Sequence, residues 1–130
     1  MSDHEALRAL VQRYARAADD HDVDALASLF HPDAVVDGTR GIQPIAEWLD
    51  TMRAPRTFPA SMHFLGDPLI DLGPDAGVGH LDTYAVVYQL GDKDAGQADM
   101  TLAIRYVDDV VRHDGRWVIR HRVARTLWMR

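Results

Sequence analysis

The chain has no cysteine among its 130 residues. This absence excludes disulfide bonds, thiolate metal sites and cysteine nucleophiles, and it leaves the redox compartment undefined. An excess of positive charge is also missing, because 20 acidic residues against 14 basic ones give a formal net charge of −6. A negative chain repels phosphate groups, so we expect no nucleic acid and no anionic membrane among its partners. Small molecules are the expected partners.

Long hydrophobic runs are absent as well. No apolar stretch approaches the roughly 20 residues that span a bilayer, and the segment Met1–Glu5 lacks the basic and apolar regions of a signal peptide. We therefore expect a cytoplasmic protein. With 130 residues, 47% of them hydrophobic, the chain is sufficient for one compact domain over residues 1–130 with a substantial core.

Hydrophobic periodicity predicts three helices in the first half of the chain. The first helix begins shortly after Ser2 or Asp3, either of which can cap it. Its buried face carries apolar residues at three- and four-residue spacing, namely Leu7, Leu10, Val11, Tyr14, Ala17 and Ala18. Asp22 is the expected cap of a second helix. Pro44 suits the first turn of a third helix, with Trp48 on its inner side.

The second half of the chain alternates between apolar and polar residues, which predicts a meander of four long strands. These strands are expected over 61–72, 77–90, 97–112 and 116–128, after a short strand at 34–37. The breaks between the long strands are rich in glycine and aspartate, as hairpin turns are. The pattern predicts the α+β class, in the order α-α-β-α-β-β-β-β, with three helices packed in a strongly curved antiparallel sheet.

Several apolar residues on the last two expected strands provide more surface than three short helices can cover. They are Met100, Leu102, Ile104, Trp117 and Ile119. A large exposed apolar patch usually marks an interface. We therefore expect a homodimer that forms through the outer face of the sheet, with two-fold symmetry.

Three residues provide the chemistry that the rest of the chain lacks: Tyr14, Asp19 and His63. A phenol, a carboxylate and an imidazole can polarise a carbonyl and move protons near neutral pH without a metal or an organic cofactor. His63 lies between Met62 and Phe64 in a strand-like run, so its side chain lies on the opposite sheet face from theirs. We expect that face to line a pocket.

Each of these residues also has a purely structural interpretation. Tyr14 belongs to the apolar helix face, where it can be a core residue with one partner for its hydroxyl. On an ideal helix, Asp19 stands about 140° from Tyr14, so the two converge only if Asp19 lies in the final turn. Without such a turn, Asp19 is a solvated helix end. His63 can be a hydrogen-bonded core histidine.

Four further residues are candidates for contact with a substrate. His121 and Arg122 are adjacent on the last expected strand, so only one of them faces inward. Arg122 could anchor an acidic substrate, and His121 could equally lie on the surface. His80 is a candidate for a second pocket histidine, and Trp48 for part of the wall. No pair of histidines or carboxylates has metal-ligand spacing, so neither a metal nor another cofactor is expected.

The chain resembles a SnoaL-like member of the NTF2-like superfamily over nearly its whole length. The resemblance rests on four segments: Tyr14–Leu26, Leu29–Ala34, Met62–Gly66 and Asp114–Ile119. Within that superfamily, the His-Phe-Leu-Gly and Asp-x-x-Asp-x-Asp segments are most similar to scytalone dehydratase and to bile-acid dehydratases. This resemblance implies a cone-shaped half-barrel with a deep pocket between helices and sheet. It also implies that Asp19 orients the catalytic imidazole of His63.

The sequence departs from these dehydratases at several positions. Scytalone dehydratase has a second catalytic histidine, and bile-acid dehydratases an acidic residue, near the position of Val86, which becomes a further candidate for substrate contact. Two water-holding tyrosines of scytalone dehydratase are replaced by Ala18 and Gly38, so scytalone is not the expected substrate. The base of ketosteroid isomerases aligns with Gly38, one residue after Asp37, which weakens an isomerase interpretation.

The predicted function is that of a cofactor-independent acid–base enzyme, most plausibly a lyase that removes water from a small cyclic or polyketide-like carbonyl compound. His63 would move the proton, Asp19 would hold the imidazole tautomer, and Tyr14 would donate to the carbonyl oxygen. One alternative is an isomerase or cyclase that uses the same residues. Another is a non-catalytic NTF2-like domain that binds a small ligand.

Overall fold

The computed structural model describes residues 1–130, which form three helices and seven strands. The helices are α1 (Asp3–Asp19), α2 (Val23–Ser28) and α3 (Ile45–Arg53). The strands are β1 (Phe30–Gly38), β2 (Gly41–Pro44), β3 (Ala60–Leu65), β4 (Leu69–Leu72), β5 (Val78–Leu90), β6 (Met100–His113) and β7 (Arg116–Met129). The predicted α+β class is confirmed. No helix is both long enough and apolar enough to cross a membrane.

Side chains cap the first two helices, as the sequence predicts. Ser2 Oγ accepts a hydrogen bond from the backbone N–H of Glu5 at 3.1 Å. Asp22 Oδ1 accepts one from the N–H of Ala25, also at 3.1 Å. Each bond satisfies an amide that has no partner within the first helical turn. The two caps therefore mark where α1 and α2 begin.

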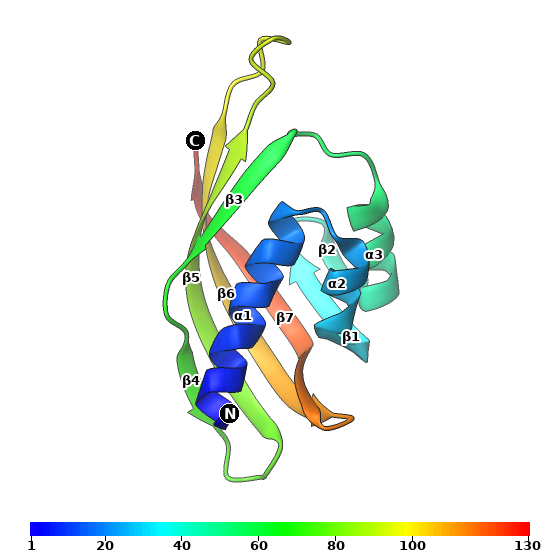
Figure 1. Ribbon diagram of the computed structural model, residues 1–130, viewed down its shortest axis with the longest axis vertical. Helices are drawn as coiled ribbons and strands as arrows, with labels where there is room; N and C mark the ends of the chain where they lie inside the picture. The colour runs from blue at the N-terminus through cyan, green and yellow to red at the C-terminus, as the bar shows by residue number, and fades with distance from the viewer.

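The strands form one curled sheet in the order β2-β1-β7-β6-β5-β3, with β4 also paired to β5. The helices lie on its concave side (Figure 1). Strand β3 is at one edge of this order, where it pairs with β5 alone. All pairs are antiparallel except β1 with β7, which is parallel. The prediction of a purely antiparallel sheet therefore fails at this pair, because alternation shows that a segment is a strand but not which way its neighbour runs.

The expected strand over 61–72 is divided into β3 and β4. Leu65 pairs with Ala85 and Leu69 with Asp82, so residues 66–68 lie opposite only residues 83 and 84. Pro68 falls in this interruption and has no N–H to give to the ladder. The long strand β5 therefore pairs with two short strands, β3 and β4. Of these two, β3 contacts α1.

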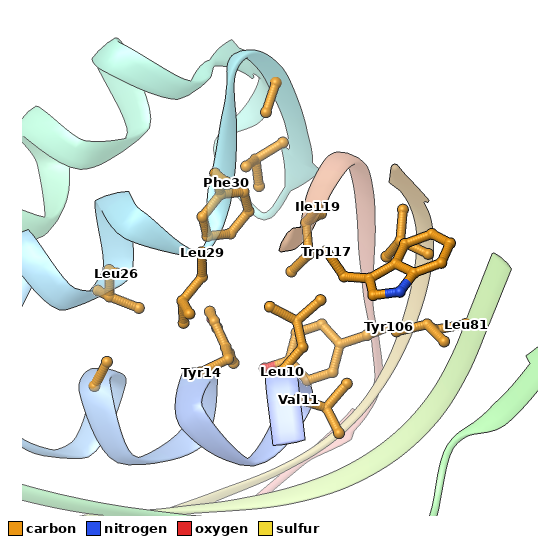
Figure 2. Packing of buried hydrophobic residues seen from close by; sticks show 14 of the residues in the cluster. Leu10, Val11, Tyr14, Leu26, Leu29, Phe30, Leu81, Tyr106, Trp117 and Ile119 are labelled. Atoms are coloured by element: carbon orange, nitrogen blue, oxygen red, sulfur yellow. The ribbon is translucent and has the colours of Figure 1, made fainter. Parts of the chain in front are cut away.

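The core lies between the helices and the concave face of the sheet. Figure 2 shows side chains from α1, β1, β5, β6 and β7 converging there. Trp117 and Ile119 belong to this core, and Leu102 and Ile104 line the cavities beside it. The expected exposed patch is therefore wrong for Trp117 and Ile119, which are buried. The pattern identifies side chains that share a face but not the face that the helices cover. The exposed apolar side chains of the sheet are others, among them Met62, Phe64, Tyr84 and Trp128.

Candidate active site

Asp19 and His63 form a hydrogen-bonded pair between the end of α1 and the middle of β3. Asp19 Oδ1 lies 2.6 Å from His63 Nδ1. Asp19 is the last residue of α1. It therefore lies in the final turn, as its approach to Tyr14 requires. Both side chains are largely buried, at 22% exposure for Asp19 and 11% for His63. The structure thus brings the two residues together.

Two further donors hold the Asp19 carboxylate. The backbone N–H of His63 donates to Oδ2 at 2.9 Å and to Oδ1 at 3.1 Å. The hydroxyl of Ser61 donates to Oδ1 at 3.0 Å. Charge-assisted hydrogen bonds of this kind are among the strongest in proteins. Ser61 was not predicted as a site residue, although its position two residues before His63 places it on the same sheet face.

The carboxylate decides which nitrogen of His63 carries the proton. An ionised carboxylate only accepts hydrogen bonds, so Nδ1 is the donor and Nε2 is left with a free lone pair. The His63 side chain lines both of the cavities described below. An imidazole with this tautomer, next to a cavity, is able to accept a proton there.

Tyr14 packs directly against His63. The two ring centroids are 6.1 Å apart, with the rings nearly perpendicular at 89°. Tyr14 also contacts Tyr106 of β6, at 5.7 Å between centroids. It is buried, at 7% exposure, and still lines both cavities. The three residues singled out in the sequence therefore meet at one place.

Arg122 lies beneath Tyr14 in a fully buried ion pair with Asp108. The distances are 2.7 Å from Nε to Oδ1 and 3.0 Å from Nη2 to Oδ2. Burial favours a lower pKa for the Arg122 guanidinium, but the charge and hydrogen bonds of Asp108 outweigh it and raise that pKa above its usual value. The guanidinium carbon lies 4.0 Å from the centroid of the Tyr14 ring and 4.2 Å from that of Tyr106. Arg122 Nη1 is buried and has no hydrogen-bond partner.

Two adjoining cavities of about 270 and 250 Å³ lie between the helices and the sheet. Their shared walls are Tyr14, Arg40, Trp48, Met52, His63 and Gln89. Arg122 lines the second of them, together with the apolar side chains of Val87, Leu102 and Ile104. The predicted positions of Trp48 and Arg122 beside a pocket agree with this arrangement. No group of three or more histidine, aspartate or glutamate side chains is arranged to hold a metal ion.

The predicted substrate contacts at His80, Val86 and His121 are corrected by the structure, because all three lie outside these cavities. On β5, the odd-numbered residues are buried and the even-numbered ones face outward, so Val87 rather than Val86 reaches the cavity. His80, also on the outer face, pairs with Asp109 at 2.5 Å. His121 lies opposite Asp109 and shares that face. Of the adjacent pair on β7, Arg122 faces inward.

Asp108 and Gln43 are buried residues of the site that the sequence analysis missed. Asp108 alternates with Ile104 and Tyr106 on β6, so its inward position could have been inferred from the pattern. Gln43 lines the second cavity, with Nε2 at 3.4 Å from Glu47 and 3.5 Å from Thr51 of α3. Strand β2, which carries Gln43, was not expected, and no short-range signal marks a strand of four residues.

A curled, unclosed sheet wrapped around helices, with a cavity between them, defines an NTF2-like fold. The chain belongs to the family of SnoaL-like domains, whose family model matches residues 1–123. None of the curated proteins compared with it matches significantly by sequence.

Solved structures resemble the whole chain at low sequence identity. A candidate scytalone dehydratase from Novosphingobium aromaticivorans is 22% identical, with a TM-score of 0.87 over 100% of this chain and 91% of the other. Hexachlorocyclohexane dehydrochlorinase LinA-type3 from Novosphingobium barchaimii is 16% identical, with a TM-score of 0.81 over 97% and 87%. A candidate aromatic ring hydroxylase from N. aromaticivorans is 22% identical, with a TM-score of 0.80 over 97% and 90%. These likenesses show a shared fold, which hosts different reactions.

Proposed function

We propose that the protein is a cofactor-independent acid–base enzyme that acts on a small molecule, and specifically a lyase that removes water from a cyclic or polyketide-like carbonyl compound. The observation that carries the proposal is the Asp19–His63 pair. Asp19 binds Nδ1 of His63, and this leaves Nε2 free in a side chain that lines both cavities. A histidine that served only to fill the core would have both nitrogens satisfied. The contact of Tyr14 with the same imidazole adds a hydroxyl donor to the site.

The proposed reaction begins with proton transfer from carbon to nitrogen. His63 Nε2 takes a proton from the carbon next to the substrate carbonyl, and the electron pair of that C–H bond forms the enolate. The Tyr14 hydroxyl donates a hydrogen bond to the enolate oxygen, where negative charge develops. Asp19 stabilises the imidazolium that His63 has become. Each positioned group of this kind contributes on the order of 10²–10⁴ in rate.

The second step expels water. The enolate re-forms the carbonyl and its electron pair makes the new C=C bond, while the C–O bond to the hydroxyl breaks. His63 returns its proton from Nε2 to this leaving oxygen, so the products are an unsaturated carbonyl compound and water. The imidazole is neutral again at the end, and no oxidant, reductant or metal takes part.

Arg122 is proposed to contact the substrate from the buried end of the second cavity. Its charge is fixed by Asp108, and its unpartnered Nη1 is a buried donor in a residue that lines the cavity. An unpaired buried donor costs free energy, which a substrate oxygen would recover. Such a contact favours negative charge on the substrate, and this is what the enolate supplies.

The relatives support elimination as the type of reaction. One solved structure is named for dehydration and another for dehydrochlorination, and both reactions remove a proton and a leaving group. An isomerase or cyclase would use the same proton transfer without loss of water. The mass of the product separates these outcomes, since only dehydration lowers it by that of one water.

The proposal is tested with a panel of cyclic β-hydroxyketones, by mass spectrometry of the products and by uptake of solvent deuterium next to the carbonyl. The wild type is expected to catalyse loss of water, and His63→Ala to abolish both signals. Val78→Ala, at an exposed residue of β5 outside the cavities, is the control and is expected to leave them unchanged. Saturable binding without deuterium uptake or water loss would favour the ligand-binding alternative.

We also propose a homodimer in the cytoplasm, formed through the outer sheet face. An apolar groove on that face is lined by Phe64, Tyr84, Leu127 and Trp128, among others, and these four are roughly half-exposed or more. Exposed aromatic patches are characteristic of interfaces. Sedimentation velocity at micromolar concentration tests the dimer, and a single species near 14.6 kDa would contradict it. Cell fractionation tests the location.

A further inference from the structure

The charges that line the cavities have the opposite sign to the charge of the chain. The protein has a formal net charge of −6, with 20 acidic residues. The two cavities are nevertheless lined by three arginines and two histidines, and by no aspartate or glutamate. The arginines are Arg40, Arg56 and Arg122. A cavity of this sign concentrates anions and repels cations.

The arginines differ in whether their charge is already neutralised. Arg122, at the buried end, is paired with Asp108. Arg40 and Arg56 are exposed and make no salt bridge. They come from separate segments, the turn between β1 and β2 and the connection between α3 and β3. Two uncompensated guanidinium groups therefore lie at the solvent side of the cavities.

Arg56 is linked to the catalytic pair by hydrogen bonds. Its Nη2 donates to Ser61 Oγ at 3.2 Å, and Ser61 Oγ donates to Asp19. Arg56 and Asp19 do not form a direct salt bridge, because Ser61 lies between them in this chain of hydrogen bonds. Arg56 is thus held near the site while its remaining N–H groups are free to bind an incoming group.

Apolar side chains share the walls of the cavities with these charged groups. Trp48 and Met52 line both cavities, as does Arg40, while Phe58 and Pro55 line the first. A ligand whose reacting carbon lies at His63 therefore has both apolar side chains and Arg40 within the same cavity. This lining suits a flat or cyclic body with a charged group at one end.

We propose that the substrate carries an anionic oxygen group, a carboxylate or a phosphate, which Arg40 and Arg56 bind while its apolar body packs on Trp48 and its reacting carbon faces His63. Arginine suits this task because its planar fork binds both groups in a bidentate manner. The inference rests on the proposed function for the reacting end only. Binding of the anionic group is measured separately from turnover.

The test compares three probes that share a ring system: 2-naphthoate, 2-naphthyl phosphate and the neutral methyl 2-naphthoate. Isothermal titration calorimetry on the full chain at low salt gives the Kd of each. At least one anion is expected to bind about tenfold more tightly than the ester, which is the lower end of the range for one hydrogen bond to a charged group. This advantage is expected to shrink as salt is added. The two anions distinguish a carboxylate site from a phosphate site.

Substitutions assign the effect to the two arginines. Arg40→Gln and Arg56→Gln are each expected to weaken the preferred anion about tenfold and to leave the Kd of the ester unchanged. The control is Arg53→Gln, which removes the same charge from α3 at an exposed residue that pairs with Asp50 and lines neither cavity. It is expected to leave all three Kd values unchanged.

Several outcomes would overturn the inference. These are equal binding of anions and ester by the wild type, failure of both anions to bind at millimolar concentration, or equal losses in the control and in the two variants. His63→Ala separates the two proposals, because it is expected to keep the preference for anions while activity is lost. If the wild type shows that preference without turnover, the proposed reaction is wrong and the anion site stands.

Discussion

The Asp19 carboxylate binds both the backbone N–H and the imidazole Nδ1 of the same residue, His63. One side chain therefore fixes the strand position and the ring orientation of its partner together. A histidine held at two points loses little further conformational freedom when a substrate binds. The pair joins the end of α1 to an edge strand more than 40 residues away in the chain.

The first prediction concerns this pair. His63→Ala, Asp19→Asn and the double variant are expected to lose similar amounts of activity, because residues that act as one unit are strongly non-additive. Steady-state kinetics on a compound turned over by the wild type provides the measurement. Additive losses in the double variant would show that the two residues act independently.

The second prediction separates packing from catalysis at Tyr14. Tyr14→Phe keeps the ring that contacts His63, Tyr106 and Arg122, and removes only the hydroxyl. Turnover is expected to fall about tenfold to a thousandfold, the range for loss of a donor to developing negative charge. The melting temperature is expected to change little. Unchanged turnover would make Tyr14 a core residue only.

The third prediction concerns the buried ion pair. Asp108→Ala leaves the Arg122 guanidinium buried without its partner, which typically costs about 3–5 kcal/mol in the free energy of unfolding. The double variant Asp108→Leu with Arg122→Met removes both charges and is expected to be more stable than Asp108→Ala. Urea denaturation at neutral pH measures both.

The partly exposed pair of Asp82 and Arg105 on the outer face provides the control for this experiment. There, Arg105 lowers the pKa of Asp82 by hydrogen bonding and by its charge. Because solvent screens this pair, Asp82→Ala is expected to cost about 1 kcal/mol or less. Equal losses at Asp82 and Asp108 would show that burial does not decide the cost.

The fourth prediction is alkaline destabilisation through Tyr106. Burial raises the pKa of its phenol well above the ordinary value, and Tyr14 adds to this. Above about pH 10 the unfolded phenol loses its proton while the folded one keeps it, so the unfolded state binds fewer protons and stability falls as pH rises. The contribution is complete below about pH 10 and is lost progressively above it.

Urea denaturation between pH 8 and pH 11 tests this linkage. Tyr106→Phe is expected to flatten the alkaline fall in stability, because it removes the group that titrates differently in the two states. Tyr88→Phe changes a partly exposed phenol and is expected to leave the fall as it is. A wild-type slope that survives in Tyr106→Phe would assign the effect to other residues.

The sequence was sufficient to predict the helices, the meander and the meeting of Tyr14, Asp19 and His63. The meeting could be predicted because alternation placed His63 on one face and because the family resemblance supplied the pairing. Which face of β5 is covered could not be predicted, since Val86 and Val87 are chemically identical. Two other features depend on contacts between distant segments, which local periodicity does not show. They are the parallel pairing of β1 with β7 and the inward orientation of the Arg122 side chain.

The edge position of β3 has a consequence for solubility. An edge strand presents unpaired N–H groups on which a second chain can add a strand and begin an aggregate. In β3, the N–H of His63 is bound by Asp19, and α1 lies against the strand. The Asp19 carboxylate thus accepts the hydrogen bond that a neighbouring strand would otherwise accept from this N–H. The residue proposed to orient the imidazole also occupies an N–H of the edge strand, so its replacement would expose that N–H to pairing with a second chain.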